Sequence, residues 1–259
     1  MKDHQARKRF GQHFLHDRNV IARIAAALAP TNDDVIVEIG PGTGALTREL
    51  LNRVKHLHAV EFDRDLVARL NSEIAPERLT LHQADALKFE FCPLATAGRK
   101  LRVIGNLPYN ISTPLLFHLL EQAGCIQDML FMLQKEVVTR LAAGPGGKDY
   151  GRLSVMIQYR CAVEKLFNVA PGAFTPPPQV DSSIVRLVPH ATPPVAVNDV
   201  ERFAQLVKAA FTSRRKVLRN TLKGWVTPEI MAALGIDAGR RAETLSLAEF
   251  AALSNAPTE

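Results

Sequence analysis

The chain has 259 residues, of which 47% are hydrophobic and 22% charged, so it is long enough to form one sizeable domain and a smaller one. Its 32 Lys and Arg against 26 Asp and Glu give a net charge of +6, which suits a polyanionic partner if the excess is clustered. No apolar run reaches the length of a transmembrane helix, and the N-terminal residues are too charged for a signal peptide. We therefore expect a cytoplasmic protein with no membrane partner.

The three cysteines, Cys92, Cys125 and Cys161, lie far apart in the sequence and form no Cys-x-x-Cys pair. This spacing indicates neither a zinc site nor a disulfide framework. We therefore expect no metal, and buried thiols in a reducing compartment.

The N-terminal residues 1–23 are rich in Lys and Arg, with Phe10 and Phe14 among them. A flexible basic arm is expected for residues 1–9, whereas the two aromatic rings indicate that the residues after it dock on the protein. Asp17 can then cap a helix that ends before residue 30.

A buried strand is predicted over residues 34–39, and it runs directly into Gly40-Pro41-Gly42-Thr43-Gly44-Ala45. Glycines are needed where the backbone approaches a ligand or adopts a positive φ, and the N-terminus of the helix that follows presents unpaired N–H groups. The pattern predicts a nucleotide-binding strand–loop–helix unit. It also satisfies the dinucleotide fingerprint, so a dehydrogenase is an alternative at this point.

Acidic residues follow the next two predicted strands. The strand over 56–61 ends in Glu61, whose carboxylate can accept both ribose hydroxyls of an adenosine, in a dinucleotide or in a sulfonium cofactor. The strand over 79–82 is followed by Asp85, which taken alone could equally cap a loop. Glu61 is therefore the clearer candidate for a cofactor contact.

The segment Asn106-Leu107-Pro108-Tyr109 follows a fourth predicted strand. Pro108 fixes its own φ and biases Leu107 away from helix, which holds the amide of Asn106 and the ring of Tyr109 in a preset relation. The amide oxygen and nearby main-chain carbonyls can accept both hydrogens of an exocyclic amine, while the ring can stack on a base. An ordinary Asn-x-Pro turn is the alternative. Because nicotinamide chemistry needs no such corner, the segment favours a pocket for an aminated nucleobase over a dehydrogenase.

The alternation of strands and helices continues beyond this segment. Residues 144–151 are glycine-rich and predict a mobile loop. The three prolines of 176–178 stiffen their segment into an extended conformation, for which a polyproline ligand of another domain is the generic interpretation. Further strands are predicted over 129–133, 153–159 and 183–188, and further helices over 113–123 and 135–142.

A Pro-rich stretch over 190–198 is typical of a linker, and helices are predicted to follow it. Residues 208–223 contain several Lys and Arg and no acid, with Arg215, Arg219 and Lys223 at helical spacing. A solvated helix face is the usual explanation of such a charge run. Like charges on one face repel each other, however, so a polyanion is the more natural partner.

Taken together, these motifs resemble the KsgA family of small-subunit rRNA adenine dimethyltransferases. The resemblance rests on Asn-Leu-Pro-Tyr-Asn-Ile-Ser-Thr over 106–113, on Lys-Arg-Phe-Gly-Gln-His-Phe-Leu over 8–15, and on the aromatic, proline and serine pattern of 174–182. A further element, Ala-Phe-Thr-Ser-Arg-Arg-Lys over 210–216, is similar to one in the family's helical domain. The motifs occur in the family's order and cover nearly the whole chain.

The resemblance implies an α/β fold, with a Rossmann-like seven-stranded class I methyltransferase domain over 1–190 whose last strands form an antiparallel edge. A small all-helical RNA-binding domain is implied over 199–259. The implied reaction uses S-adenosyl-L-methionine to dimethylate the exocyclic amines of two adjacent adenosines, in a hairpin near the 3′ end of 16S rRNA within the small ribosomal subunit. The implied protein is a monomer with a role in ribosome biogenesis. A large-subunit rRNA methyltransferase of the antibiotic-resistance type and an assembly factor with secondary methylation are the alternatives.

The resemblance also implies roles for individual residues. Phe174 and Tyr109 would lie on either side of the target adenine, and many relatives have Asn where this chain has His13. The implied catalytic residues are Asn106, Leu107, Pro108, Tyr109 and Phe174; the implied cofactor contacts are His13, Leu15, Gly40, Gly42, Glu61, Asp85 and Asn106; the implied RNA contacts are Arg214, Arg215, Lys216, Arg219 and Lys223.

Overall fold

The computed structural model describes residues 12–96 and 98–257, so the basic arm expected over 1–9 lies outside the described residues. The chain forms two compact units. The first contains the residues up to Val138 together with Glu164–Pro189, and the second contains Thr139–Val163 together with the residues from His190 onward. The second unit thus includes residues 139–163, which we expected in the first, and the division into two domains of separate function stays a prediction.

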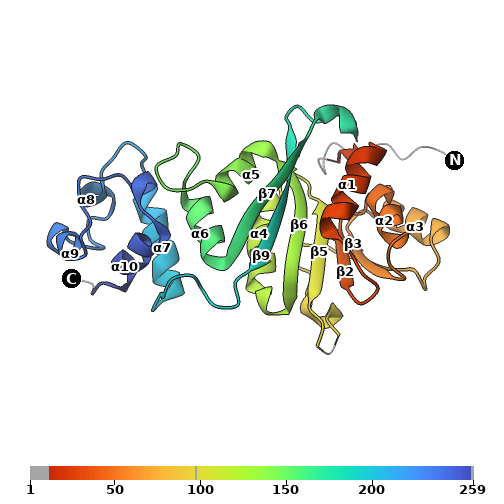
Figure 1. Cartoon of the computed structure of the whole chain (residues 1–259), viewed down its shortest axis with the longest axis horizontal. Coiled ribbons are helices and arrows are strands. Elements are labelled where there is room, and N and C mark those ends of the chain that lie inside the picture. The colour runs from red at the N-terminus through yellow and green to blue at the C-terminus, as the bar shows by residue number, and fades with distance from the viewer. Residues whose placement is uncertain (1–11, 97, 258–259) are drawn as a thin grey trace. The chain divides into compact units, whose positions relative to one another are not determined.

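A seven-stranded sheet in the order β4-β3-β2-β5-β6-β9-β7 forms the centre of the α/β fold (Figure 1). The pairs from β4 to β6 are parallel, and β9 runs antiparallel to β6. This is the predicted Rossmann-like architecture with an antiparallel edge. The strands are β2 (Val35–Ile39), β3 (Leu57–Glu61), β4 (Leu79–Gln83), β5 (Leu101–Asn106), β6 (Ile126–Gln134), β7 (Cys161–Val169) and β9 (Ser182–Pro189).

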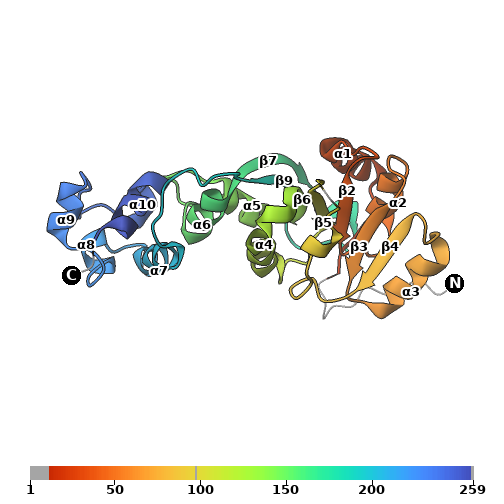
Figure 2. The same ribbon diagram turned by 90° about the horizontal axis from the view of Figure 1, so that it is seen from below.

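Helices cover both faces of this sheet, with α1 (Arg18–Leu28) and α4 (Ser112–Glu121) on opposite sides (Figures 1 and 2). One hydrophobic cluster joins α1 and α2 (Ala45–Leu51) to alternate strand residues such as Ile36 and Ile104. Successive side chains of a strand point to opposite faces, so Val37 and Val103, which are fully buried, face the other side. The near-continuous apolar strands of the sequence are therefore explained by burial on both faces.

Two short strands tie the N-terminal segment to the proline-rich segment. In β1 (Phe14–Leu15) and β8 (Phe174–Thr175), Phe14 pairs with Thr175 and Leu15 with Phe174 in antiparallel register. Asp17 then begins α1, because its carboxylate accepts the backbone N–H groups of Asn19 and Val20. The predicted docking of Phe14 and the predicted cap are confirmed, whereas Phe10 lies outside the described residues.

The second unit is helical apart from the first residues of β7. The rings of Tyr159 and Phe203, on different helices, lie 5.0 Å apart, and both are buried. A helical C-terminal region was predicted and is present. The remaining helices of the fold are α3 (Arg64–Glu73), α5 (Lys135–Ala142), α6 (Arg152–Arg160), α7 (Val200–Ala210), α8 (Leu218–Thr221), α9 (Pro228–Ala233) and α10 (Leu247–Asn255).

The strand predicted over 153–159 is wrong, because these residues form helix α6 and the strand follows it as β7. Five consecutive residues of α6, from Leu153 to Ile157, are buried. An element that is buried all round shows no polar face, so its periodicity cannot distinguish a helix from a strand.

A single basic helix over 208–223 is also wrong. Helix α7 ends at Ala210, turns follow, and the four-residue α8 begins only at Leu218. Arg215 therefore lies in a turn, and the helical spacing that related it to Arg219 and Lys223 does not exist in the structure. All three side chains are nevertheless exposed.

The loop over 144–151 is held in place by hydrogen bonds within the second unit, although we predicted it to be mobile. The backbone N–H of Gly146 donates to the carbonyl of Glu243 at 2.7 Å, and the guanidinium of Arg214 donates to the carbonyls of Lys148 and Tyr150 at 2.6 and 3.2 Å. Tyr150 is 1% exposed. A buried tyrosine thus anchors the end of the loop.

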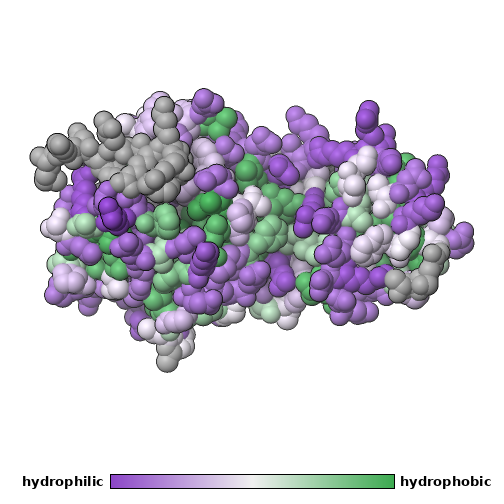
Figure 3. Space-filling model, turned by 180° about the vertical axis from the view of Figure 1, so that it is seen from behind, coloured by the Kyte–Doolittle hydropathy of each residue, from purple (hydrophilic) through white to green (hydrophobic). Residues whose placement is uncertain are grey.

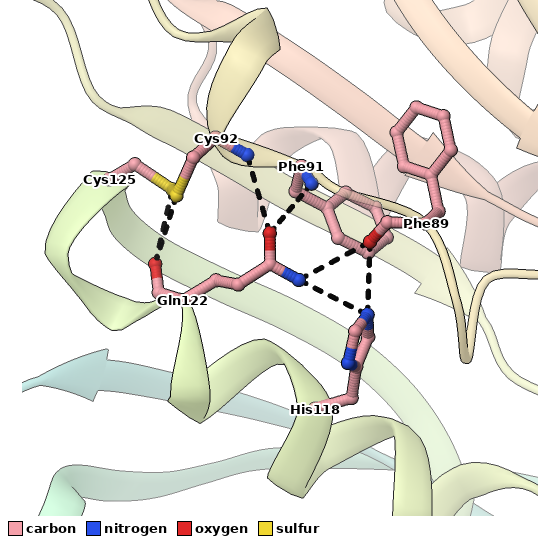
Figure 4. Close-up of a disulfide and its surroundings, with 6 residues drawn as sticks. All are labelled: Phe89, Phe91, Cys92, His118, Gln122 and Cys125. Atoms are coloured by element: carbon pink, nitrogen blue, oxygen red, sulfur yellow. Dashed lines mark hydrogen bonds between the residues drawn. A yellow bond between two sulfur atoms is a disulfide. The ribbon is translucent and has the colours of Figure 1, made fainter.

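Cys92 and Cys125 form a disulfide, which corrects the prediction of three free thiols (Figure 4). Gln122 supports the same junction, because its side-chain oxygen accepts the N–H of Phe91 at 2.7 Å and its amide group donates to the carbonyl of Phe89 at 3.2 Å. The pairing was not visible in the sequence because 33 positions separate the two cysteines without a motif. Cys161 is free and buried, as predicted.

None of the helices in the described part of the chain combines the length and the hydrophobicity that crossing a membrane requires.

Candidate active site

A cavity of about 310 Å³ opens at the carboxyl ends of β2, β3 and β5 in the first unit. The chain leaves β2 on one side toward β3 and β4, and it later returns on the other side as β5, so the cavity lies where the strand order reverses. This switch point is where open α/β sheets bind their ligands. The predicted cofactor residues that line the cavity are His13, Leu15, Gly40, Gly42, Glu61, Asp85 and Asn106, and the catalytic segment contributes Leu107, Pro108 and Tyr109.

The loop after β2 brings bare backbone to the cavity. Gly40 and Gly42 have φ values of +67° and +57°, a conformation that glycine adopts without steric strain. A Cβ atom on Gly42 would also lie 3.1 Å from the ring of Phe14. A side chain at residue 42 would therefore strain the backbone and crowd β1.

Glu61 joins the glycine loop to the end of β3. Its two carboxylate oxygens accept the backbone N–H groups of Asp63 at 2.8 Å and Gly42 at 3.3 Å. The side chain is mostly buried, and this desolvation raises the pKa of Glu61. The remaining lone pairs can accept hydrogen bonds from a ligand's hydroxyl groups, which would help to keep the carboxylate ionised.

Glu38 is a cavity residue that the sequence analysis did not select. It is 2% exposed next to the last residue of β2, and the hydroxyl of Thr47 donates to its carboxylate at 2.7 Å. Burial raises the pKa of Glu38 to about 7, and the nearby Glu61 adds to the shift. The available signal was a single acid in an otherwise apolar strand directly before the glycine loop.

Asn106 has its side-chain amide oriented by a hydrogen bond. Nδ2 donates to the main-chain carbonyl of His13 at 2.9 Å, so Oδ1 remains as the acceptor of this side chain. The residue after it is also held, because the N–H of Leu107 donates to the carbonyl of Met132 at 3.2 Å. The corner predicted from the sequence is therefore a rigid one.

The Tyr109 side chain contacts two other segments of the chain. Its hydroxyl lies 2.7 Å from the hydroxyl of Ser182, and the imidazole of His13 is stacked on it with ring centroids 5.8 Å apart. Nδ1 of His13 lies 2.8 Å from the carbonyl of Pro176. Burial raises the pKa of Tyr109 above its usual value, so the hydroxyl stays protonated at neutral pH.

Phe174 lies in a setting that differs from expectation, whereas Asp85 lies in the cavity wall. Phe174 is 2% exposed and packs in the hydrophobic cluster with Leu15, and among the described residues it is not part of the cavity lining. Its stacking on a base stays a prediction that this placement does not support. Asp85 does line the cavity, and its carboxylate accepts the N–H of Leu87 at 3.0 Å.

The basic residues predicted to bind RNA lie in the second unit, whose visible face in Figure 3 is mostly hydrophilic or neutral. Arg214 contacts the backbone of the loop over 144–151 and so has a structural role in the fold. All five residues of the set are exposed, and Arg215, Lys216, Arg219 and Lys223 lie beside Arg214 in the sequence or follow it within nine positions.

The donor set of the cavity fits an adenosine-containing sulfonium cofactor. Its volume of about 310 Å³ matches a small-molecule site, and Glu61 presents a carboxylate beside close-approaching glycine backbone. Across residues 12–96 and 98–257, no group of three or more His, Cys, Asp or Glu side chains is arranged to hold a metal ion.

The strand order, the glycine loop at the switch point and the Asn-Leu-Pro-Tyr corner define a Rossmann-like methyltransferase that uses S-adenosyl-L-methionine. The family model described as ribosomal RNA adenine dimethylase matches residues 3–258. The chain belongs to the ribosomal RNA adenine dimethylase family.

Similar proteins agree with this assignment. The chain is 59% identical over 255 residues to ribosomal RNA small subunit methyltransferase A of Alcanivorax borkumensis, covering 98% of this chain and 91% of the relative. It is 58% identical over 253 residues to the protein of that name from Nitrosococcus oceani, covering 97% and 96%. Among solved structures, a dimethyladenosine transferase from Plasmodium falciparum matches with a TM-score of 0.79 and 26% identity, covering 93% of this chain and 96% of that one. The 23S rRNA methyltransferase ErmE matches with a TM-score of 0.73 and 27% identity, covering 93% and 98%.

Proposed function

We propose that this protein dimethylates the exocyclic amines of two adjacent adenosines, in a hairpin near the 3′ end of 16S rRNA within the small ribosomal subunit. The observation that carries the proposal is the oriented amide of Asn106, whose Nδ2 is bonded to the His13 carbonyl at 2.9 Å. An amine that enters the cavity meets an acceptor and not a donor at this position. The relatives named small subunit methyltransferase A, at 56–59% identity, favour this substrate over large-subunit rRNA.

The residues around the cavity divide the binding of the cofactor between them. The carboxylate of Glu61 accepts hydrogen bonds from the ribose hydroxyls, and that of Asp85 accepts one from the adenine amine. Gly40 and Gly42 let the backbone approach the cofactor closely. His13 and Leu15 complete the wall of the cavity. S-adenosyl-L-methionine supplies a methyl group on a positively charged sulfur when it is bound. Burial of the cavity away from water strengthens each of these contacts.

The target amine is a poor nucleophile, because its lone pair is delocalised into the adenine ring. Oδ1 of Asn106 and a main-chain carbonyl of Leu107 or Pro108 accept its two hydrogens, which favours a pyramidal nitrogen and directs the lone pair toward the donor side of the cavity. Tyr109 stacks on the base, which contributes ~1–3 kcal/mol. No strong general base is required, because the methylated nitrogen cation is acidic and loses its proton after transfer.

The RNA must present an unpaired base, since the amine is inaccessible in a paired stack. Arg215, Lys216, Arg219 and Lys223 contact phosphates of the rRNA and hold the hairpin. The protein acts as a monomer in the cytoplasm, where it takes part in ribosome biogenesis.

The proposal is tested with labelled S-adenosyl-L-methionine and unmodified small ribosomal subunits, with free rRNA and duplex DNA in parallel. Products are mapped by nuclease digestion and mass spectrometry. Dimethyladenosine at two neighbouring positions in the subunit sample is the expected result. Label on large-subunit RNA or DNA would keep the chemistry and overturn the substrate, whereas tight RNA binding without transfer would favour an assembly factor.

A further inference from the structure

Ser182 is a buried polar residue that the proposed mechanism does not use. It is 0% exposed at the start of β9, and its hydroxyl lies 2.7 Å from the hydroxyl of Tyr109. Either oxygen can donate in this pair. A buried hydroxyl needs a hydrogen-bond partner, so each residue satisfies the other.

The position of Ser182 is set by the sheet. Its Cα is paired with Gln134 in the antiparallel ladder between β6 and β9. The residue before Ser182 is also held. The backbone N–H of Lys135 donates to the carbonyl of Asp181 at 2.9 Å, and the ammonium of Lys135 lies 3.0 Å from the Asp181 carboxylate. The hydroxyl of Ser182 is therefore carried by backbone that is bonded on both sides of the residue.

The Tyr109 residue is held at both of its ends. At the backbone end, the hydroxyl of Ser112 donates to the Tyr109 carbonyl at 3.1 Å, and the N–H of Ile111 donates to the carbonyl of Pro108 at 3.2 Å. At the far end of the ring, Ser182 is the partner of the phenol. Together these two attachments fix the direction of the ring's long axis, and the imidazole of His13, stacked on the ring, limits how far the ring plane can rotate about that axis. The ring remains half-buried and lines the cavity.

We propose that Ser182 is a positioning residue for methyl transfer, because its hydroxyl holds the far end of the Tyr109 ring, and with it the direction of the ring's long axis, before the target base arrives. The inference rests on the proposed function, in which Tyr109 stacks on that base. A ring that is already oriented loses less conformational freedom when the base binds, so preorganisation favours binding of the base in the reactive geometry. Without the Ser182 hydroxyl, the phenol loses its buried partner and the far end of the ring can move by rotation about the Cα–Cβ bond of Tyr109.

The test compares Ser182→Ala, Tyr109→Phe and the double variant. Ser183→Ala is the matched control, because Ser183 is the next residue of β9, is also 0% exposed, and donates its hydroxyl to Asn168 at 2.7 Å, away from the cavity lining. For each protein, kcat/KM on unmodified small subunits, cofactor affinity and thermal unfolding are measured. Quenching of a 2-aminopurine placed at the target position of an rRNA hairpin reports stacking independently of transfer.

Ser182→Ala and Tyr109→Phe are each expected to lower kcat/KM for the RNA about tenfold, the loss typical of one buried hydrogen bond, and to weaken the quenching. The double variant is expected to be no worse than Tyr109→Phe, since both remove the same interaction. Cofactor affinity is expected to stay within about twofold, and Ser183→Ala to keep the kcat/KM of the wild type even if it lowers the unfolding temperature.

Equal losses in Ser182→Ala and Ser183→Ala would show a structural effect of any missing hydroxyl on β9 and would overturn the inference. The inference would also be overturned if the loss of kcat/KM in the double variant equalled the product of the two single losses, or if Ser182→Ala left the quenching of 2-aminopurine unchanged. Failure of the proposed function has a different signature, because the wild type itself would then neither methylate the subunit nor quench the probe.

Discussion

The side-chain amide of Asn106 donates to the main-chain carbonyl of His13, 93 positions earlier in the chain, at 2.9 Å. The bond connects the segment before α1 to the end of β5, and it decides which end of the amide faces the cavity. The nitrogen and the oxygen of the Asn106 amide cannot exchange places, because the His13 carbonyl can only accept a hydrogen bond and therefore needs Nδ2 beside it. The N-terminal segment thus contributes to the polarity of the site through its backbone.

Asn106→Ala is expected to lower methyl transfer by at least about a hundredfold, because it removes the acceptor that orients the amine. Binding of S-adenosyl-L-methionine, measured by titration, is expected to change little, since Glu61 and the glycine loop remain. Turnover comparable to the wild type, with the fold intact by circular dichroism, would refute the assigned role.

Glu38→Gln is expected to change how stability depends on pH. Burial raises the pKa of Glu38 from 4.5 to about 7, so between these values the unfolded chain releases a proton that the folded chain retains. The free energy of unfolding of the wild type therefore falls as pH rises through this window, by roughly 3 kcal/mol in all from this group. The variant lacks the ionisation, while its amide oxygen can still accept from Thr47.

Denaturant unfolding at about pH 5 and about pH 8 checks this expectation. The variant is expected to gain stability relative to the wild type at the higher pH and little at the lower one. A difference between the two proteins that is the same at both pH values would mean that Glu38 is ionised in the folded protein throughout.

Reduction of the Cys92–Cys125 disulfide is expected to lower the free energy of unfolding by about 4 kcal/mol, the chain-entropy value for a loop that closes over 33 positions. The junction is expected to keep its fold, because Gln122 still bonds to the backbone of Phe91 and Phe89. Unfolding with and without dithiothreitol measures the loss. A Cys92→Ser, Cys125→Ser double variant is the control and should not respond to the reductant.

A thiol count gives an independent check of the same feature. The unfolded chain, prepared without reductant, is expected to show one reactive thiol, which belongs to Cys161. Three reactive thiols would contradict the disulfide.

Arg215→Glu together with Arg219→Glu is expected to weaken binding of rRNA and to reduce the slope of log affinity against log salt by about 1 for each phosphate that the protein no longer neutralises. Cofactor affinity is expected to be unchanged. Lys55→Glu with Arg64→Glu makes the same change of charge at exposed positions of the first unit and serves as the control. An unchanged slope in the first pair would assign the RNA surface to other residues.

The sequence was most informative where a local backbone conformation requires a particular type of residue. The positive φ values of Gly40 and Gly42 require glycine, Asp17 has the chemistry of a helix cap, and the apolar strands alternate with helices at α/β spacing. These features predicted the central sheet and the glycine loop that lines the cavity. Each depends on local chemistry that a short stretch of sequence contains.

The features that could not be predicted depend on contacts between distant segments. The burial of Phe174 follows from the pairing of β8 with β1, and the orientation of Asn106 follows from the carbonyl of His13. Helix α6 was mistaken for a strand because its buried residues show no period, and the turn after α7 interrupts a charge pattern that a continuous helix would have explained. In each case the deciding partner lies outside the segment.

Gly105 allows β5 to approach β2 closely at the edge of the active site. A Cβ atom there would lie 2.5 Å from the carbonyl oxygen of Ile39, so β5 and β2 touch through main-chain atoms alone just before both strands end. One strand continues into the glycine loop and the other into Asn106. The separation between the glycine loop and Asn106 is therefore set by the main-chain spacing of two neighbouring strands, which a side chain at residue 105 would force apart.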